Sequence, residues 1–249
     1  AQFNLGNMHR VGKEIPQNSE LAAYWFIKSA EQEHMVAQYN MGVAYAHGEG
    51  VTKNISAALN WYNKAAEQGH AKAEYQLGLM HKRGDGVSQS DEAAVIWFTK
   101  SAAQDNASAQ FNLGLMFDEG MGVIENSKTA AHWYTLATQQ GYAEAQLRLA
   151  LMYEVGRGVP KNAPKALKLF ALAAEQVVAL AHYNMPLAFE TGKGPPKDLL
   201  LLFEWYRQAP DQGPPQAQSN LGIFIKRGNG IPKNDLIGIK CLTLAPDQG

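Results

Sequence analysis

Apolar and polar residues along the chain follow a helical period that is interrupted at regular intervals. In the stretch 71–81 (AKAEYQLGLMH) apolar residues fall at helical spacing, and the glycine-rich segment 84–87 (GDGV) then breaks the pattern. A second helical pattern opens after Asp91 and covers 92–98, and the polar pair 105–106 closes the unit. The short loop between the two helices predicts that they are antiparallel neighbours.

This two-helix unit recurs every 36 residues along the chain. Its clearest marker is a glycine that follows each first helix, where a left-handed C-cap residue is expected. These turn glycines are Gly12, Gly48, Gly84, Gly120, Gly156, Gly192 and Gly228. A fixed period of this length predicts an all-α solenoid, in which each repeat buries its apolar face against its neighbours. We expect one repeat array over 1–249, with repeats at about 1–33, 37–69, 73–105, 109–141, 145–177, 181–213 and 217–249.

Further columns of the repeat are constant in size or chemistry. Small residues, which let helix backbones approach closely, form two columns in the first helix: Ala37, Ala73, Ala109, Ala145, Ala181 and Ala217, and Gly6, Gly42, Gly78, Gly114, Ala150, Pro186 and Gly222. Good N-cap residues precede the second helix: Asn18, Asn54, Asn126, Asn162, Asp198 and Asn234. Recurrent aromatics predict a core between repeats: Trp25, Trp61, Trp97, Trp133 and Trp205.

The segments 78–86, 97–98 and 65–69 (AAEQG) resemble the Sel-one-like repeat family, a 36-residue relative of the tetratricopeptide repeat. The resemblance covers essentially the whole chain. It implies a right-handed superhelix of antiparallel helix pairs, and a role as an adaptor that holds protein complexes together. Cysteine-rich bacterial members of the family carry a disulfide in each repeat, and this chain differs from them because Cys241 is its single cysteine.

Composition narrows the partners that we expect. The formal net charge is −1 and no basic stretch could follow a phosphate backbone, so nucleic acid is not an expected partner. No apolar run reaches the roughly 18 residues that suggest a membrane span, and the chain shows no signal-like segment. The location of the protein is not indicated by the sequence, but its solubility is expected.

The sequence contains no recognisable catalytic motif, so we expect a protein that is not an enzyme and has no cofactor. Its Gly-x-Gly turns lie between helices and not between a strand and a helix, which argues against a dinucleotide site. His9 and His81 share a column with aromatic residues, which indicates a structural role. His34 and His70 share a turn column, but two histidines do not make a metal site.

One polar column suggests a binding role. This column lies two residues before the column that begins with Gly6. Its members are Asn4, Asn40, Gln76, Asn112, Arg148, Asn184 and Asn220. In tetratricopeptide repeats the asparagine of a similar Asn-Leu-Gly step faces the concave groove and holds an extended peptide, and the steps at 4–6, 112–114 and 220–222 match it. An amide both donates and accepts, which suits a peptide backbone. The alternative is a hydrogen-bond ladder between helices that serves stacking alone.

Charges on the same face vary between repeats, as a specific binding surface or a solvated face would. Lys82 and Arg83 in one repeat are replaced by Asp118 and Glu119 in the next, which favours a partner of mixed charge. We therefore expect a protein-interaction scaffold that binds a protein or extended peptide on its concave face. The alternatives are an enzyme acting on cell-wall or glycan material, and a structural element that associates end to end.

The last two repeats depart from the pattern of the first five. Pro186 lies inside a first helix, where proline costs about 3 kcal/mol, and Pro210 and Pro246 replace an alanine of the Ala-Ala-Glu-Gln-Gly motif. Either this end has diverged for a function or the residue identities there are uncertain. The chain also lacks a polar capping helix at either end, so we expect a longer native protein or ends that pack on another molecule.

Overall fold

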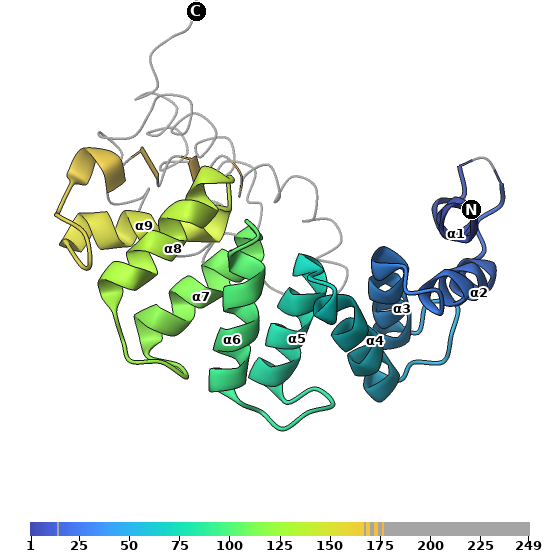
Figure 1. Cartoon of the computed structure of the whole chain (residues 1–249). Helices are drawn as coiled ribbons and strands as arrows, with labels where there is room; N and C mark the ends of the chain where they lie inside the picture. The colour runs from blue at the N-terminus through green and yellow to red at the C-terminus, as the bar shows by residue number, and fades with distance from the viewer. Residues whose placement is uncertain (14, 167, 170–171, 174–175, 177–249) are drawn as a thin grey trace, which may run out of the picture. The chain divides into compact units, whose positions relative to one another are not determined.

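The computed structural model describes residues 1–13, 15–166, 168–169, 172–173 and 176. Within these residues the chain is helical and contains no strand. Figure 1 shows the labelled helices in chain order, each followed by a turn. Their bounds are α1 Gln2–Val11, α2 Ser19–Ala30, α3 Met35–His47, α4 Ile55–Glu67, α5 Ala71–Arg83, α6 Asp91–Ala102, α7 Ala107–Glu119, α8 Ser127–Gln139 and α9 Ala143–Val155. The predicted alternation of first helices (odd numbers) and second helices (even numbers) is confirmed.

The chain divides into two units at Trp133 and Tyr134, inside α8. In the first unit each helix from α1 to α7 packs against the next one in the chain. In the second unit, Tyr134, Ala145, Leu149 and Met152 are buried.

The turn glycines adopt the left-handed conformation that the sequence predicts. The C-cap glycines of the first helices have φ values of 71°, 80°, 76°, 68° and 83°, in the order Gly12, Gly48, Gly84, Gly120 and Gly156. At Gly84 the backbone N–H donates to the carbonyl of Met80, which closes the last turn of α5. A side chain would strain this backbone, so glycine ends the first helix here. Gly192 and Gly228 lie outside the described residues.

Side-chain caps fix the start of each described second helix. The Oδ1 atoms of Asn18, Asn54 and Asn126 accept from backbone N–H groups three residues on, at 2.9–3.0 Å. Asn162 does the same at 3.0 Å, ahead of the helical residues that begin at 163. In the third repeat Ser90 is the cap, and its Oγ accepts from the N–H of Ala93 at 3.1 Å. The four described asparagines of this column are therefore N-caps, as predicted, and Asp198 and Asn234 lie outside the described residues.

The small residues of the first helices make room for an aromatic ring of the second helix. A Cβ atom on Gly78 would lie 2.5 Å from the ring of Phe98, and one on Gly6 would lie 2.7 Å from Phe26. Both rings are buried, as is Tyr62 opposite Gly42. The glycine column therefore lets α1, α3 and α5 lie against the rings of α2, α4 and α6.

Trp61 and Trp97 of the tryptophan column join successive repeats, as predicted, and Trp205 lies outside the described residues. Trp61 of α4 packs against the core formed by α2 and α3, and Trp97 of α6 packs against that of α4 and α5. The exposed face of each of these rings carries a lysine: Lys64 Nζ lies 4.4 Å from the centre of the Trp61 ring, and Lys100 Nζ lies 4.4 Å from that of Trp97. Each ring therefore serves the core and also a cation–π contact at the surface.

Candidate functional site

A row of side chains on each first helix of the first unit is open to solvent. Residues at positions i, i+4, i+7 and i+11 share one face of a helix. We call the set that contains the predicted polar column the first-helix stripe. It consists of Val36, Asn40, Val43 and His47 on α3; Lys72, Gln76, Leu79 and Arg83 on α5; and Ser108, Asn112, Leu115 and Glu119 on α7. All of these residues are half-buried or exposed, so the stripe is accessible to a partner.

The structure divides the predicted polar column into engaged and free members. The side chain of Gln76 is hydrogen-bonded to the hydroxyl of Tyr39. Asn112 Nδ2 donates to the carbonyl of Ser108 at 2.9 Å. Within the described residues the side chains of Asn4 and Asn40 form no hydrogen bond, and Asn4 is exposed. Gln76 and Asn112 are therefore engaged within the protein, whereas Asn4 and Asn40 keep their amide groups free within the described residues.

The bond between Gln76 and Tyr39 connects the first helices of two successive repeats. Burial raises the pKa of the Tyr39 hydroxyl, and the hydrogen bond from Gln76 offsets part of that rise. At this position the amide contributes to the packing of one repeat on the next. Arg148, at the equivalent position on α9, is half-buried, whereas Asn184 and Asn220 lie outside the described residues.

The charged residues predicted for this face differ in exposure. Arg83 and Glu119 are exposed and Lys82 is half-buried. Asp118 is buried, with 5% of its surface exposed, so the expectation of a free surface charge was wrong for this residue. Its short carboxylate stays within the last turn of α7, whereas the longer stem of Lys82 at the equivalent position carries its charge to solvent.

Two histidines have a role that the sequence analysis missed. The Nδ1 atoms of His34 and His70 accept from the backbone N–H groups of Ala37 and Ala73 at 3.2 Å, so they cap α3 and α5. Each ring also stacks on an aromatic ring of the preceding first helix, with centroid distances of 4.5 Å for Phe3 and 4.6 Å for Tyr39. Burial, with a smaller effect from Lys72, lowers the pKa of His70, which suits a neutral ring that accepts at Nδ1.

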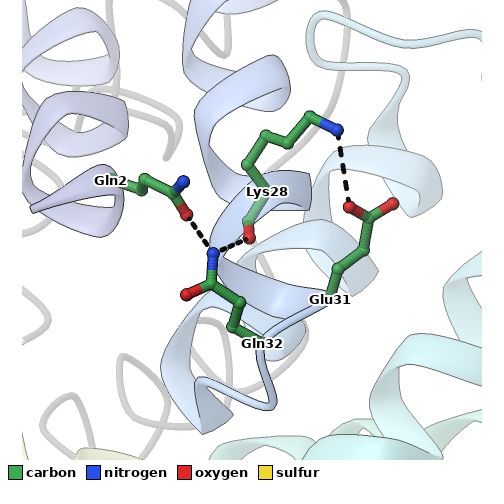
Figure 2. A network of polar contacts seen from close by, with 4 residues as sticks. All are labelled: Gln2, Lys28, Glu31 and Gln32. Carbon is green, nitrogen blue, oxygen red and sulfur yellow. Dashed lines mark hydrogen bonds and ion pairs between the residues drawn. The ribbon is translucent and has the colours of Figure 1, made fainter.

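The sequence analysis also missed a polar bridge between the two ends of each helix pair. Gln32 Nε2 donates to Gln2 Oε1 at 2.8 Å and to the carbonyl of Lys28 at 3.1 Å (Figure 2). An ion pair of 3.6 Å between Lys28 and Glu31 lies beside it. We call this bridge, together with its counterparts thirty residues apart in other repeats, the amide clasp.

The amide clasp recurs in both units. Its other described members are Gln68 to Gln38 at 2.8 Å, Gln104 to Glu74 at 2.8 Å and Gln176 to Gln146 at 3.1 Å. In the second repeat the accepting residue also donates to the preceding repeat: Gln38 Nε2 lies 3.3 Å from the carbonyl of Ala30. The constant separation of 30 residues was the signal in the sequence that could have revealed the clasp. It closes each helix pair and joins the pair to its neighbour.

The described part of the chain has the features of neither a metal site nor a membrane span. No group of three or more His, Cys, Asp or Glu residues there could hold a metal ion. Over the same residues, no helix has the length and apolar character needed to cross a membrane. His9 and His81 are half-buried, and their Nδ1 atoms are buried without a hydrogen-bond partner in the described part.

Antiparallel helix pairs with left-handed glycine turns and a ring-to-glycine core define an α-solenoid built from helical repeats. The family model of the Sel1 repeat matches residues 1–34, 36–70, 71–106, 107–142, 143–177, 179–214 and 215–249. The chain therefore belongs to the Sel1 repeat family, as its motifs predicted. Proteins of this family generally act as scaffolds for protein–protein interaction and are typically not enzymes.

Two solved structures are similar over nearly the whole chain. A protective antigen present in uropathogenic Escherichia coli strains, with an SLR fold, is 32% identical with a TM-score of 0.71. The match covers 100% of this chain and 53% of the antigen, so the chain spans about half the length of that protein. A Sel1 repeat protein from Oxalobacter formigenes is 29% identical with a TM-score of 0.67, over 99% of this chain and 84% of the other. A search of curated proteins gave no match.

Proposed function

We propose that this protein is an interaction scaffold whose partner, a protein or an extended peptide, binds the first-helix stripe and the neighbouring Asn4. The observation that carries the proposal is the state of the two amides at the start of the column. Asn4 and Asn40 stand on helices fixed by buried cores, yet their side chains form no hydrogen bond within the described residues. Each can still donate to and accept from a polypeptide backbone.

Rigidity of the surface favours this function. The glycine–ring contacts, the helix caps and the amide clasp hold the first helices in fixed positions. A partner that binds a preformed surface loses less entropy in ordering the complex, so modest contacts suffice for affinity. Val43 and Leu79 of the stripe are half-buried: each packs partly against the core of the following repeat and leaves the rest of its apolar surface for a partner to cover.

A cross-linked capture experiment tests the proposal in the cells that make the protein. The wild-type chain is compared with an Asn4→Ala, Asn40→Ala variant. An Asn60→Ala, Asn63→Ala variant on the second helix α4 is the matched control, because it loses the same groups from a different helix. We expect a partner that the wild type and the control capture and the Asn4/Asn40 variant does not. Equal capture by all three proteins would contradict the proposed surface.

A further inference from the structure

Three of the first helices, α1, α3 and α5, differ from the second helices in the sign of their exposed charges. On α1, α3 and α5 every charged side chain that is not buried is basic: Arg10, Lys72, Lys82 and Arg83. The acidic residue of these helices, Glu74, is 4% exposed and belongs to the amide clasp. The second helices carry both signs, with Glu20 and Lys28 on α2 and Glu92 and Lys100 on α6. Because the whole chain has a net charge of −1, this basic face does not reflect its overall composition.

The basic side chains on the two kinds of helix also differ in their contacts. On the second helices Lys28 pairs with Glu31, while Lys64 and Lys100 lie over tryptophan rings. Among the described residues, Lys72, Lys82 and Arg83 form no ion pair and no contact with a ring. Lys72, Lys82 and Arg83 of α5 are therefore available to a partner, whereas Lys28, Lys64 and Lys100 of the second helices are already engaged.

Lys72 and Arg83 lie on the same stripe of α5 and flank the half-buried Leu79. The neighbouring helix α3 adds the free amide of Asn40 and the exposed ring of His47. The surface thus offers cations at its margins, an amide for a backbone and aliphatic contacts between them. This combination complements an extended chain in which acidic and apolar side chains are interspersed.

We propose that the first-helix stripe of α3 and α5 binds an acidic, extended polypeptide segment of the partner protein. The inference rests on the proposed function and specifies its ligand. Nucleic acid fits the surface less well, because the stripe has no Phe, Tyr or Trp ring on which bases could stack and its cations are few. The acidic stripe residue of α7, Glu119, marks the boundary of the basic surface along the first helices.

Selection from a random peptide library displayed on phage, with the immobilised full chain as bait, tests this inference. We expect the selected peptides to be enriched in Asp and Glu, and their binding to weaken as salt concentration rises. The affinity of a selected peptide is then measured by fluorescence anisotropy for two charge-reversal variants. Lys72→Glu, Arg83→Glu removes cations from the stripe, and Lys53→Glu, Lys128→Glu makes the same change in net charge at exposed lysines elsewhere.

The stripe variant is expected to bind the peptide at least about tenfold more weakly, and the control variant to stay within about twofold of the wild type. Circular dichroism verifies that both variants keep their helix content. Failure to enrich any peptide, selected peptides without an acidic excess, or equal weakening in both variants would overturn the inference. Binding of single-stranded DNA as tight as that of the peptide would also overturn it, since it would indicate a site for any polyanion.

Failure of this inference can be distinguished from failure of the proposed function. Neutral peptides that bind the wild type and are lost by the Asn4→Ala, Asn40→Ala variant would leave the scaffold surface in place and remove only its preference for acidic ligands. The capture experiment with the Asn60→Ala, Asn63→Ala control decides the proposed function separately, because it does not depend on the charge of the partner.

Discussion

The second and third repeats form the amide clasp at equivalent positions but with different acceptor groups. In the second repeat two neutral amides meet, Gln68 donating to Gln38 at 2.8 Å. In the third repeat the acceptor is the carboxylate of Glu74, which receives the Nε2 of Gln104 at the same distance. Both acceptors are 4% exposed. The replacement of Gln38 by Glu74 at the equivalent position therefore makes the buried acceptor of the clasp ionisable, while the hydrogen-bond distance stays the same.

The difference affects the link to the preceding repeat. Gln38 uses its amide N–H to reach the carbonyl of Ala30, and Gln110 reaches Ala102 in the same way, each at 3.3 Å. An ionised Glu74 has no proton to donate to the corresponding carbonyl, that of Ala66. Burial accordingly raises the pKa of Glu74, and the opposing effects of Lys100 and Gln104 are smaller. The comparison indicates that the third repeat is joined less firmly to its predecessor at neutral pH.

The largest expected effect concerns a feature that both repeats share, the buried aromatic ring that packs on a glycine of the first helix. Phe98→Ala in the third repeat and Tyr62→Ala in the second each remove a buried ring that packs on the glycine of a first helix. Each should lower the free energy of unfolding by about 3–5 kcal/mol, because the cavity cannot fully collapse. Urea unfolding followed by circular dichroism measures both. A cost below about 1 kcal/mol in either repeat would contradict the ring-to-glycine core described for it.

The second prediction breaks the neutral clasp. Gln38→Leu removes the acceptor of Gln68 and the donor to the carbonyl of Ala30, and leaves buried polar groups without those partners. We expect the free energy of unfolding to fall by about 2 kcal/mol, within the range for unsatisfied buried groups. Leucine has a similar volume, so lost packing contributes little. The exposed Gln89→Leu serves as the control and should change the value by less than about 0.5 kcal/mol.

The sequence was sufficient to predict those features of the repeats in which a single residue meets a local requirement. The turn glycines, the asparagine caps and the glycine column each reflect a local requirement of backbone or volume, so their 36-residue period was enough. It missed the clasp because Gln38 and Gln68 belong to different helices, and only packing brings them together. The polar column could not be resolved for a similar reason. Gln76 is hydrogen-bonded to Tyr39, whereas the residue that corresponds to Tyr39 in the preceding repeat is Phe3, which offers Asn40 no hydroxyl.

The third prediction concerns a substitution that gives the clasp of the third repeat the neutral amide acceptor found in the second. Glu74→Gln restores an amide that can donate to the carbonyl of Ala66, as Gln38 does to Ala30. At pH 8 the variant should be more stable than the wild type by about 1 kcal/mol, the typical value of one hydrogen bond.

The sign of its pH dependence follows from the raised pKa of Glu74. A carboxyl that binds its proton more tightly in the folded chain stabilises the protein while protonated. That contribution is lost as the pH rises above the ordinary value of 4.5 and through the folded pKa. The advantage of Glu74→Gln should therefore be larger at pH 8 than at pH 4 in urea unfolding. An advantage that does not change with pH would show that Glu74 carries no buried charge.

The smallest effect concerns the turn that follows each second helix. Its left-handed residue is Gly69 in the second repeat, with φ 82°, and Asp105 in the third, with φ 58°. A Cβ atom on Gly69 would meet nothing within 4 Å, so any cost of Gly69→Ala comes from backbone conformation alone. We expect a loss of about 1 kcal/mol for Gly69→Ala.

The reverse change, Asp105→Gly, should stabilise the third repeat by about 0.5 kcal/mol or less. Aspartate tolerates the left-handed region better than alanine does, so there is less strain to relieve. The side chain of Asp105 also accepts a long hydrogen bond of 3.5 Å from Gln110, which the substitution removes. The urea unfolding midpoints of the two variants measure the difference between the loss caused by Gly69→Ala and the gain caused by Asp105→Gly. Equal and opposite shifts would mean that the aspartate is as strained as alanine, and that the two repeats differ in their turns as much as in their clasps.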